Sequence, residues 1–382
     1  MVGAALLSIS LVAAPQRKAA IVSPDTKIDR IFAAVTDNRS PGVAVLVRRN
    51  GHTLLQREYG VKELRTRGAI DSRTNFRLAS CTKQFTAMAI MLLVHDGKLR
   101  YEERLTDIFP SFPEYGEFIT IRNLLNHTSG LPDYEELMDT ASSGQPSPWS
   151  ETRQIRDEEV LALLQAQKKG KFAPGTNWSY SNSGYVVLGL VVAKVSGESF
   201  ADFLRNRIFR PLKMNHTLAY VKGKAPIPDR AYGHAKERNG FTEADQSATS
   251  ATLGDGGVYS DLEDLALWDD ALAHHTLLSE TEMQPALTAV KLANGSQPYW
   301  AGAPGDSDPQ PGKPVSYGFG WFRDPYRGHA RMWHYGDTIG FKTVIERFTE
   351  DNLTIIVLCN RSDLDPAALA LKVADLYLGS GK

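Results

Sequence analysis

The order of β and helical patterns along the chain is the strongest constraint on its fold. Residues 43–60, VAVLVRRNGHTLLQREYG, contain two β-type runs joined at Asn50-Gly51, a dipeptide typical of two-residue hairpin turns. Toward the other end, residues 340–348, GFKTVIERF, and 353–360, LTIIVLCN, flank the turn TEDN and predict a second hairpin. The segment PAALALKVADLYL then predicts a closing helix. We therefore expect β-strands at both ends of the chain.

The long middle of the sequence has a mostly helical pattern. Residues 156–167, RDEEVLALLQAQ, and 183–197, SGYVVLGLVVAKVSG, repeat apolar side chains at i, i+3 and i+4. No regular alternation of strands and helices indicates a parallel sheet. The expected fold class is α+β: an antiparallel sheet built from both chain ends with flanking helices, plus an inserted, mostly helical lobe. The expected bounds are 26–382 for one two-lobed domain, about 26–76 and 245–382 for its sheet lobe, and about 77–244 for its helical lobe.

Composition indicates a globular protein without a nucleic-acid partner. The chain has 382 residues, of which 42% are hydrophobic, enough for a substantial core. Its 43 basic and 44 acidic residues give a net charge of -1, and no block of like charge could follow a phosphate backbone. The only cysteines, Cys81 and Cys359, exclude a disulfide framework or a Cys-rich metal site. We expect two free, buried thiols, with a single bridge between them as the alternative.

The first residues carry an apolar segment that is too short to cross a membrane as a helix. Residues 2–14, VGAALLSISLVAA, are similar to the middle and end of a secretory signal but lack its basic front. Residues 1–20 are therefore either a signal, which implies a periplasmic or secreted protein, or a disordered tail, which leaves a cytoplasmic location open. The segments 141–149 and 302–315 are rich in proline, glycine or serine and are expected at the surface, beside a cleft.

A lysine stands at the head of the most apolar helical segment. Residues 78–94, LASCTKQFTAMAIMLLV, contain the only Ser-x-x-Lys pattern, Ser80 and Lys83. Residues three apart share one helix face, so the two side chains can meet. Burial disfavours the charged form of a lysine, and a neutral lysine can take the proton of a serine hydroxyl. The backbone N–H of Ser80 at the helix start can also face a developing oxyanion, so the pair indicates acyl transfer.

Three short motifs together resemble those of a known enzyme family. In chain order they are Ser80-x-x-Lys83, Tyr180-x-Asn182 and His334-x-Gly336, supported by ITIRNLLNHTSGLPDY (119–134), GDGGVYSDLEDLALW (254–268) and YGFGW (317–321). The sequence is similar over about residues 28–378 to the class C β-lactamase and penicillin-binding D-alanyl-D-alanine carboxypeptidase superfamily. Related esterases and D-aminopeptidases belong to the same superfamily. The Gly-x-Ser-x-Gly motif of α/β-hydrolases is absent from the sequence.

The resemblance assigns a role to each motif. It implies that Ser80 is the nucleophile, that Lys83 and Tyr180 transfer protons, and that nearby positive charge favours the Tyr180 phenolate. Asn182 would hold the substrate amide or order the lysine. The backbone N–H groups of Ser80 and Asp337 would hold the oxyanion, provided that the acidic side chain of Asp337 is turned away. Without the motif order, Tyr180 would be a partly buried aromatic residue and Asn182 a helix cap.

The third motif departs from the β-lactamase pattern, because His334 stands where those enzymes carry lysine. With Gly336 it would line the substrate cleft, but a neutral histidine anchors a substrate carboxylate less well than lysine does. The expected function is that of a serine hydrolase forming a covalent acyl-enzyme with small esters or D-residue peptides and amides. The alternatives are a β-lactamase and a penicillin-binding sensor without turnover.

No metal or cofactor is expected, and the oligomeric state stays open. The remaining histidines considered as ligands lack metal-ligand spacing and are interpreted as core or cap residues. They are His127, His216, His274 and His275.

Overall fold

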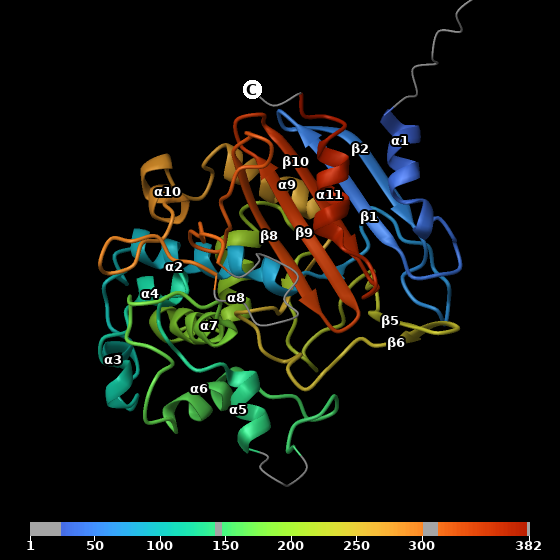
Figure 1. Ribbon diagram of the computed structural model, residues 1–382. Coiled ribbons are helices and arrows are strands. Elements are labelled where there is room, and N and C mark those ends of the chain that lie inside the picture. The colour runs from blue at the N-terminus through green and yellow to red at the C-terminus, as the bar shows by residue number, and fades with distance from the viewer. Residues whose placement is uncertain (1–23, 142–146, 301–311, 380–382) are drawn as a thin grey trace, which may run out of the picture.

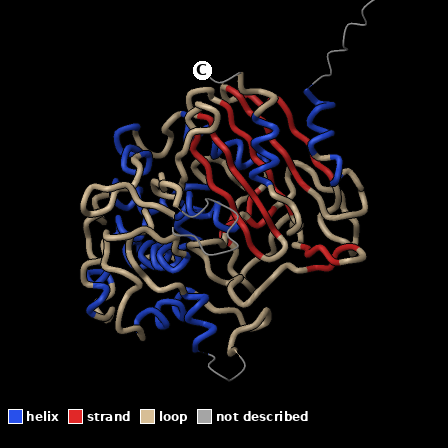
Figure 2. The backbone as a smooth tube through the Cα atoms, viewed as in Figure 1, coloured by secondary structure: helices blue, strands red, loops and turns tan. Residues whose placement is uncertain are grey.

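The sheet joins the two ends of the chain. The computed structural model describes residues 24–141, 147–300 and 312–379, so the predicted signal or tail at 1–20 lies outside the described residues. Five antiparallel strands run side by side (Figures 1 and 2). Their order is β2 (His52–Tyr59), β1 (Val43–Arg49), β10 (Leu353–Cys359), β9 (Phe341–Phe348) and β8 (Arg331–Thr338).

Both predicted hairpins are confirmed. Asn50 and Gly51 take positive φ angles of 52° and 77°, as a tight turn between β1 and β2 requires. Strands β9 and β10 pair antiparallel, with Val344 opposite Val357. The central pairing of β1 with β10 then sets Val43 opposite Cys359, so the sheet closes only when both chain ends meet. The fold therefore depends on contacts between residues about 300 positions apart.

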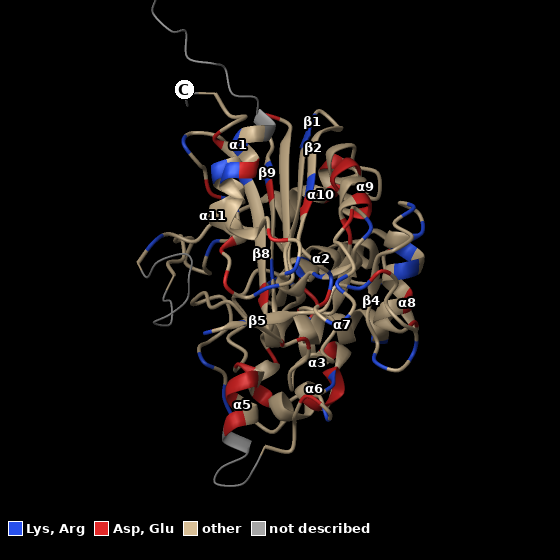
Figure 3. Ribbon diagram, turned by 90° about the vertical axis from the view of Figure 1, so that its right-hand side faces the viewer, with Lys and Arg blue, Asp and Glu red and all other residues tan. Residues whose placement is uncertain are grey.

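Both faces of the sheet are covered, which is why β1 is apolar at nearly every position. Val43, Val45 and Val47 belong to the core cluster that contains residues of α1 (Pro24–Ile31) and α11 (Pro366–Ala374). Ala44 and Leu46 point the other way, into the core cluster of α2 (Lys83–His95) and α9 (Leu262–Ala273). Figure 3 shows this layering nearly edge-on, with α1 and α11 on one side of the strands and α9 on the other. Helix α11 is shorter than the predicted segment.

The helical lobe gathers around α7 (Asn182–Ser196), which packs against α2 and four shorter helices. Its helical pattern was predicted, whereas two small sheets were not, because their strands are two to four residues long. The remaining elements are η1 (Ala33–Val35), β3 (Phe76–Arg77), η2 (Ala79–Thr82), α3 (Leu105–Ile108), η3 (Glu114–Gly116), α4 (Ile121–Leu125), α5 (Tyr134–Ala141), α6 (Asp157–Gln165), α8 (Phe200–Leu204), η4 (Arg205–Phe209), β4 (Leu218–Ala219), β5 (His234–Glu237), β6 (Gly240–Glu243), β7 (Val258–Ser260) and α10 (Glu280–Leu287).

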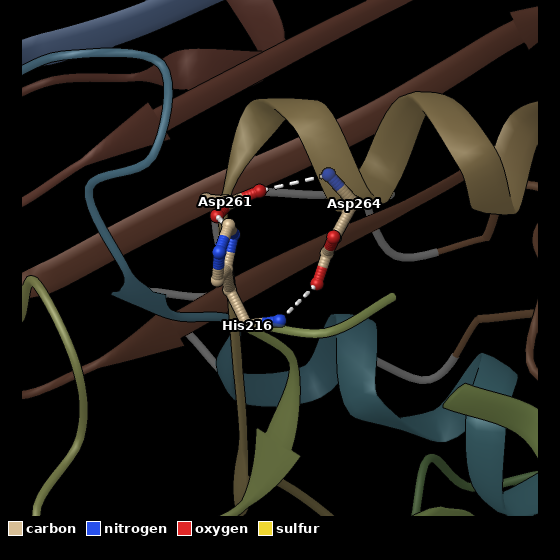
Figure 4. A group of neighbouring side chains, drawn as sticks. All are labelled: His216, Asp261 and Asp264. Atoms are coloured by element: carbon tan, nitrogen blue, oxygen red, sulfur yellow. Dashed lines mark hydrogen bonds and ion pairs between the residues drawn. The ribbon is translucent and has the colours of Figure 1, made fainter. Parts of the chain in front are cut away.

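A histidine and two aspartates fix the start of α9 (Figure 4). Asp261 caps the helix by accepting from the Asp264 N–H at 2.8 Å, and its other oxygen lies 2.8 Å from His216 Nδ1. One oxygen of Asp264 accepts from the backbone N–H groups of His216 and Thr217 and from the Thr217 hydroxyl, each at 2.8 Å. The Arg73 guanidinium lies 2.7 Å from His216 Nε2. The cap of α9 is therefore Asp261, and His216, interpreted from the sequence as a core or cap residue, supports that cap. These bonds give the cluster a structural function.

Candidate active site

Ser80 and Lys83 meet where η2 leads into α2. The Lys83 ammonium donates to Ser80 Oγ at 2.9 Å, to Asn182 Oδ1 at 2.9 Å and to the Asp255 carbonyl at 3.0 Å. Lys83 is fully buried, while Ser80 is only partly covered. The structure thus brings together the first and second predicted motifs, with the amine against the hydroxyl that it would deprotonate.

Burial prepares Lys83 to act as a base. It lowers the pKa of the Lys83 amine to about 8, against the opposing charges of Asp255 and Glu135, which raise it. A pKa of about 8 leaves roughly one-tenth of the lysine neutral at pH 7, compared with well under 0.1% for an exposed lysine. Lys83 therefore combines contact with the nucleophile and access to its unprotonated form.

We expect kcat/KM to rise with pH through a midpoint near 8, because only neutral Lys83 can accept the Ser80 proton. The measurement is a pH profile of initial rates on a neutral ester, corrected for spontaneous hydrolysis. A flat profile between pH 6 and about 9 would contradict Lys83 as the base.

Tyr180 lies beside the lysine but keeps its proton. The Lys83 ammonium is 4.8 Å from the centre of the Tyr180 ring. Among the described residues, the buried Tyr180 hydroxyl has no hydrogen-bond partner of good geometry. Burial raises the pKa of Tyr180 well above its usual value, and the neighbouring Ser80 hydroxyl offsets this only in part. The expected phenolate is therefore disfavoured in the resting site, where Tyr180 is a proton donor.

Asn182 begins α7 without capping it. Ser181 is the cap, because its hydroxyl accepts from the Gly184 N–H at 3.0 Å. The alternative interpretation of Asn182 as a cap is therefore wrong. Its amide oxygen accepts from Lys83 instead, which corresponds to the lysine-ordering role that the family resemblance implies.

Gly336 lets strand β8 touch the turn that carries Ser80. A Cβ at Gly336 would lie 2.1 Å from the Leu78 carbonyl oxygen, 2.5 Å from Thr343 Oγ1 and 3.1 Å from Ala79 Cβ. No side chain fits in this space. The glycine of the third motif therefore serves the contact between the sheet and η2.

Replacing Gly336 with alanine should reduce both stability and turnover. We expect a loss of about 1–3 kcal/mol in the free energy of unfolding, because the backbone of β8 must move away from η2. Denaturant unfolding and ester turnover measure the two effects. Gly68→Ala is the matched control, since a Cβ there meets nothing closer than 3.7 Å. Equal behaviour of the two variants would contradict the close-packing role.

The backbone of Asp337 faces outward at the sheet edge. Trp333 exchanges backbone hydrogen bonds of 2.8 and 2.9 Å with Phe322, on the side of β8 away from β9. N–H directions alternate along an antiparallel strand, so Asp337, four residues later, also directs its N–H outward. Its side chain lies on the strand face opposite Gly336 and pairs with Lys342 at 3.2 Å. The Asp337 N–H is therefore directed away from β9, and Lys342 balances the charge of its side chain.

His334 is buried and neutral. Its Nδ1 lies 2.7 Å from the Tyr335 carbonyl and its Nε2 lies 3.2 Å from the Tyr317 hydroxyl. Burial, reinforced by the charge of Lys83, lowers the pKa of His334 to about 3. His334 thus lies beside the site as an uncharged ring, and both of its ring nitrogens contact neighbouring residues. It provides no positive charge for a substrate carboxylate.

Acidic groups influence the site from the helical lobe. Asp and Glu residues are prominent on α5 and α6 in Figure 3. Although part of Glu135 is exposed, burial and the charges of Asp133 and Asp255 raise the pKa of its carboxyl to about 7. All three act on Lys83, raising its pKa. The electrostatic surroundings of the lysine are therefore acidic.

Sequence reasoning missed several residues that shape the site. Asp255 was overlooked although it lies in the supporting segment GDGGVYSDLEDLALW, and Tyr317 although it begins YGFGW. His127 was interpreted as a core or cap residue, and it is indeed buried, but it also contacts Tyr180. Cys81 and Cys359 are free and buried, as predicted. Cys81 donates to the His334 carbonyl at 3.2 Å.

Comparison with known proteins identifies the family. A family model described as Beta-lactamase matches residues 28–378. The chain belongs to the Beta-lactamase family. Within this family, penicillin-binding protein 4* of Bacillus subtilis (strain 168) is 31% identical over 366 residues, covering 92% of this chain and 75% of that protein. The D-aminopeptidase of Cereibacter sphaeroides is 25% identical over 353 residues, covering 91% of this chain and 62% of the aminopeptidase.

Solved structures agree with the predicted α+β fold. The penicillin-binding protein from Bacillus halodurans superposes with a TM-score of 0.72 at 25% identity, covering 92% of this chain and 99% of that one. D-amino acid amidase from Ochrobactrum anthropi SV3, complexed with L-phenylalanine, has a TM-score of 0.74 at 23% identity, covering 93% of this chain and 98% of the amidase chain. At this identity, the similarity to the amidase shows a shared fold. This Beta-lactamase family member is thus a serine hydrolase of the β-lactamase-like superfamily.

Among the helices formed by the described residues, none has both the length and the apolar character needed to cross a bilayer.

Proposed function

We propose that this chain hydrolyses small esters or D-residue amides through a covalent acyl-enzyme on Ser80. The observation that carries the proposal is the 2.9 Å contact between Ser80 Oγ and the fully buried Lys83 ammonium. A lysine whose pKa is lowered by burial, and which touches a serine hydroxyl, is suited to activate that hydroxyl. Tyr180, whose ring centre lies 4.8 Å from the Lys83 ammonium, supports a second proton-transfer step.

The groups of the site account for each step of acyl transfer. Neutral Lys83 takes the Ser80 proton while Oγ attacks the substrate carbonyl and forms a C–O bond. The backbone N–H groups of Ser80 and Asp337 would hold the resulting oxyanion. The C–O or C–N bond to the leaving group then breaks, and Tyr180 gives its phenolic proton to that group, with reprotonation from Lys83. Water attacks the ester on Ser80 by the reverse sequence and releases the acid.

The charge around the site favours substrates without a carboxylate. His334 is neutral, and Asp133, Glu135 and Asp255 all act electrostatically on Lys83. An anionic β-lactam would therefore meet acidic groups and no cationic partner in place of the missing lysine. Neutral esters and amides with a free ammonium group avoid this penalty, which supports the esterase and aminopeptidase type of activity over β-lactam hydrolysis.

A matched substrate panel tests the proposal. It contains p-nitrophenyl butyrate, the p-nitroanilides of D-alanine, L-alanine and N-acetyl-D-alanine, and nitrocefin. We expect turnover of the ester or the D-alanine anilide with kcat/KM at least ~100-fold above that for nitrocefin, corresponding to about 3 kcal/mol. Faster nitrocefin turnover would identify a β-lactamase. A lasting penicillin adduct on Ser80, seen by mass spectrometry without hydrolysis of any substrate, would identify a sensor.

A further inference from the structure

We propose that His127 is a positioning residue that fixes Tyr180 for proton transfer, an inference that rests on the proposed function. His127 brackets the tyrosine from both sides along the chain. Its carbonyl accepts from the Ser179 N–H at 3.0 Å, and its Nδ1 accepts from the Ser181 N–H at 3.1 Å. The residue between these two bonds is Tyr180, so one histidine holds the backbone on each side of it.

The imidazole also contacts the tyrosine ring itself. The centres of the His127 and Tyr180 rings are 4.5 Å apart, at an interplanar angle of 37°. The Tyr180 hydroxyl neighbours that of Ser80, but no hydrogen bond of good geometry with the described residues fixes it. The position of the phenol therefore depends on its ring contacts and on its backbone, and His127 contributes to both.

His127 is itself held rigidly. Only 1% of it is exposed, and its ring centre lies 4.6 Å from that of Tyr317 and 5.1 Å from that of Tyr185. The Tyr185 hydroxyl is anchored on the Leu125 carbonyl at 2.8 Å. Because its ring is packed on several sides, His127 can hold the Tyr180 side chain in one position.

The histidine acts as a neutral acceptor. Because Nδ1 accepts the Ser181 N–H, the ring proton of a neutral His127 resides on Nε2. Burial, together with the charge of Lys83, lowers the pKa of His127 well below its usual value, which agrees with this geometry. His127 also has φ of 63°, a left-handed conformation that asparagine adopts more readily than most residues.

These features define a matched pair of variants. In His127→Asn, a side-chain oxygen can stand near the former Nδ1 and accept the Ser181 N–H. In His127→Gln the same amide group lies one bond farther from the backbone and misses that position. We expect the glutamine variant to lose ~100-fold in kcat with KM changed by less than about threefold, because a displaced proton-transfer group slows chemistry more than binding. The kcat of the asparagine variant should be at least about tenfold higher than that of the glutamine variant.

The rates are expressed per reactive site, counted by labelling Ser80 with a fluorophosphonate, so partial unfolding does not enter the comparison. Equal kcat values for the two variants would overturn the positioning role, as would wild-type kcat in His127→Gln. Should His127→Gln give too little folded protein to label, His127→Ala with the same count replaces it and is expected to lose as much kcat. Should His127→Asn be the variant that fails, the kcat of His127→Gln decides alone: a loss of ~100-fold with KM nearly unchanged supports the role, and wild-type kcat overturns it. A wild-type protein that neither labels nor turns over substrate would instead overturn the proposed function.

Discussion

Replacing Ser80 with alanine is expected to lower kcat on p-nitrophenyl butyrate by ~10⁴-fold or more, because the variant has no atom that can form the acyl-enzyme. The fold should persist, since Lys83 keeps its bonds to Asn182 and to the Asp255 carbonyl. Steady-state rates and a thermal melt measure the two properties. We expect the melting temperature to change by no more than a few degrees, roughly what a loss below 1 kcal/mol produces.

The control for this variant is Ser296→Ala, which removes an exposed serine hydroxyl outside the three motifs. It should retain wild-type turnover. Mass spectrometry of wild-type protein quenched during ester turnover should show an acyl adduct on Ser80 that is absent from Ser80→Ala. Retention of a tenth or more of the activity by Ser80→Ala would reject this serine as the nucleophile.

Replacing Lys83 with arginine is expected to lower kcat by ~10³-fold, although the positive charge is kept. A guanidinium stays protonated at every pH at which the protein is folded, so it cannot accept the Ser80 proton. Lys83→Met, which removes both charge and base, should lose a similar factor. Initial rates between pH 6 and 10 should show no rise near pH 8 in either variant.

The comparison between the two variants separates two roles of the lysine. If Lys83 acted only through its positive charge, Lys83→Arg would stay active while Lys83→Met failed, and the base assignment would be wrong. Lys98→Arg is the control, because it makes the same change on an exposed lysine and should leave turnover unaffected.

Local sequence patterns predicted much of the sheet and part of the site. Alternation and turn chemistry act within a few residues, so Asn50-Gly51 was sufficient to predict the first hairpin, which the structure confirms. The spacing of Ser80 and Lys83 likewise predicted their contact, because one turn of backbone fixes the distance between them. The motif order brought Tyr180 and His334 into consideration without giving their protonation states.

Charge states could not be read from the sequence because they depend on burial. Lys83 and His334 are both buried by segments that lie far apart in the chain, and this burial lowers both pKa values. Burial raises the pKa of Tyr180 instead, because it favours the neutral form of each group and the neutral form of tyrosine is the protonated phenol. The proposed assignment of Lys83 as base and Tyr180 as proton donor therefore rests on the tertiary structure and not on the sequence pattern.

The sequence by itself determined the elements of the sheet, the order of the three motifs and the pairing of a serine with a lysine, because each of these depends on neighbours a few positions away. Only the tertiary structure decided that Gly336 touches the Ser80 turn, that the Asp255 carbonyl accepts a hydrogen bond from Lys83 and that the His127 ring lies against Tyr180. Those contacts join segments that lie far apart in the chain. They exist only in the assembled tertiary structure, and no local pattern encodes the distance between them.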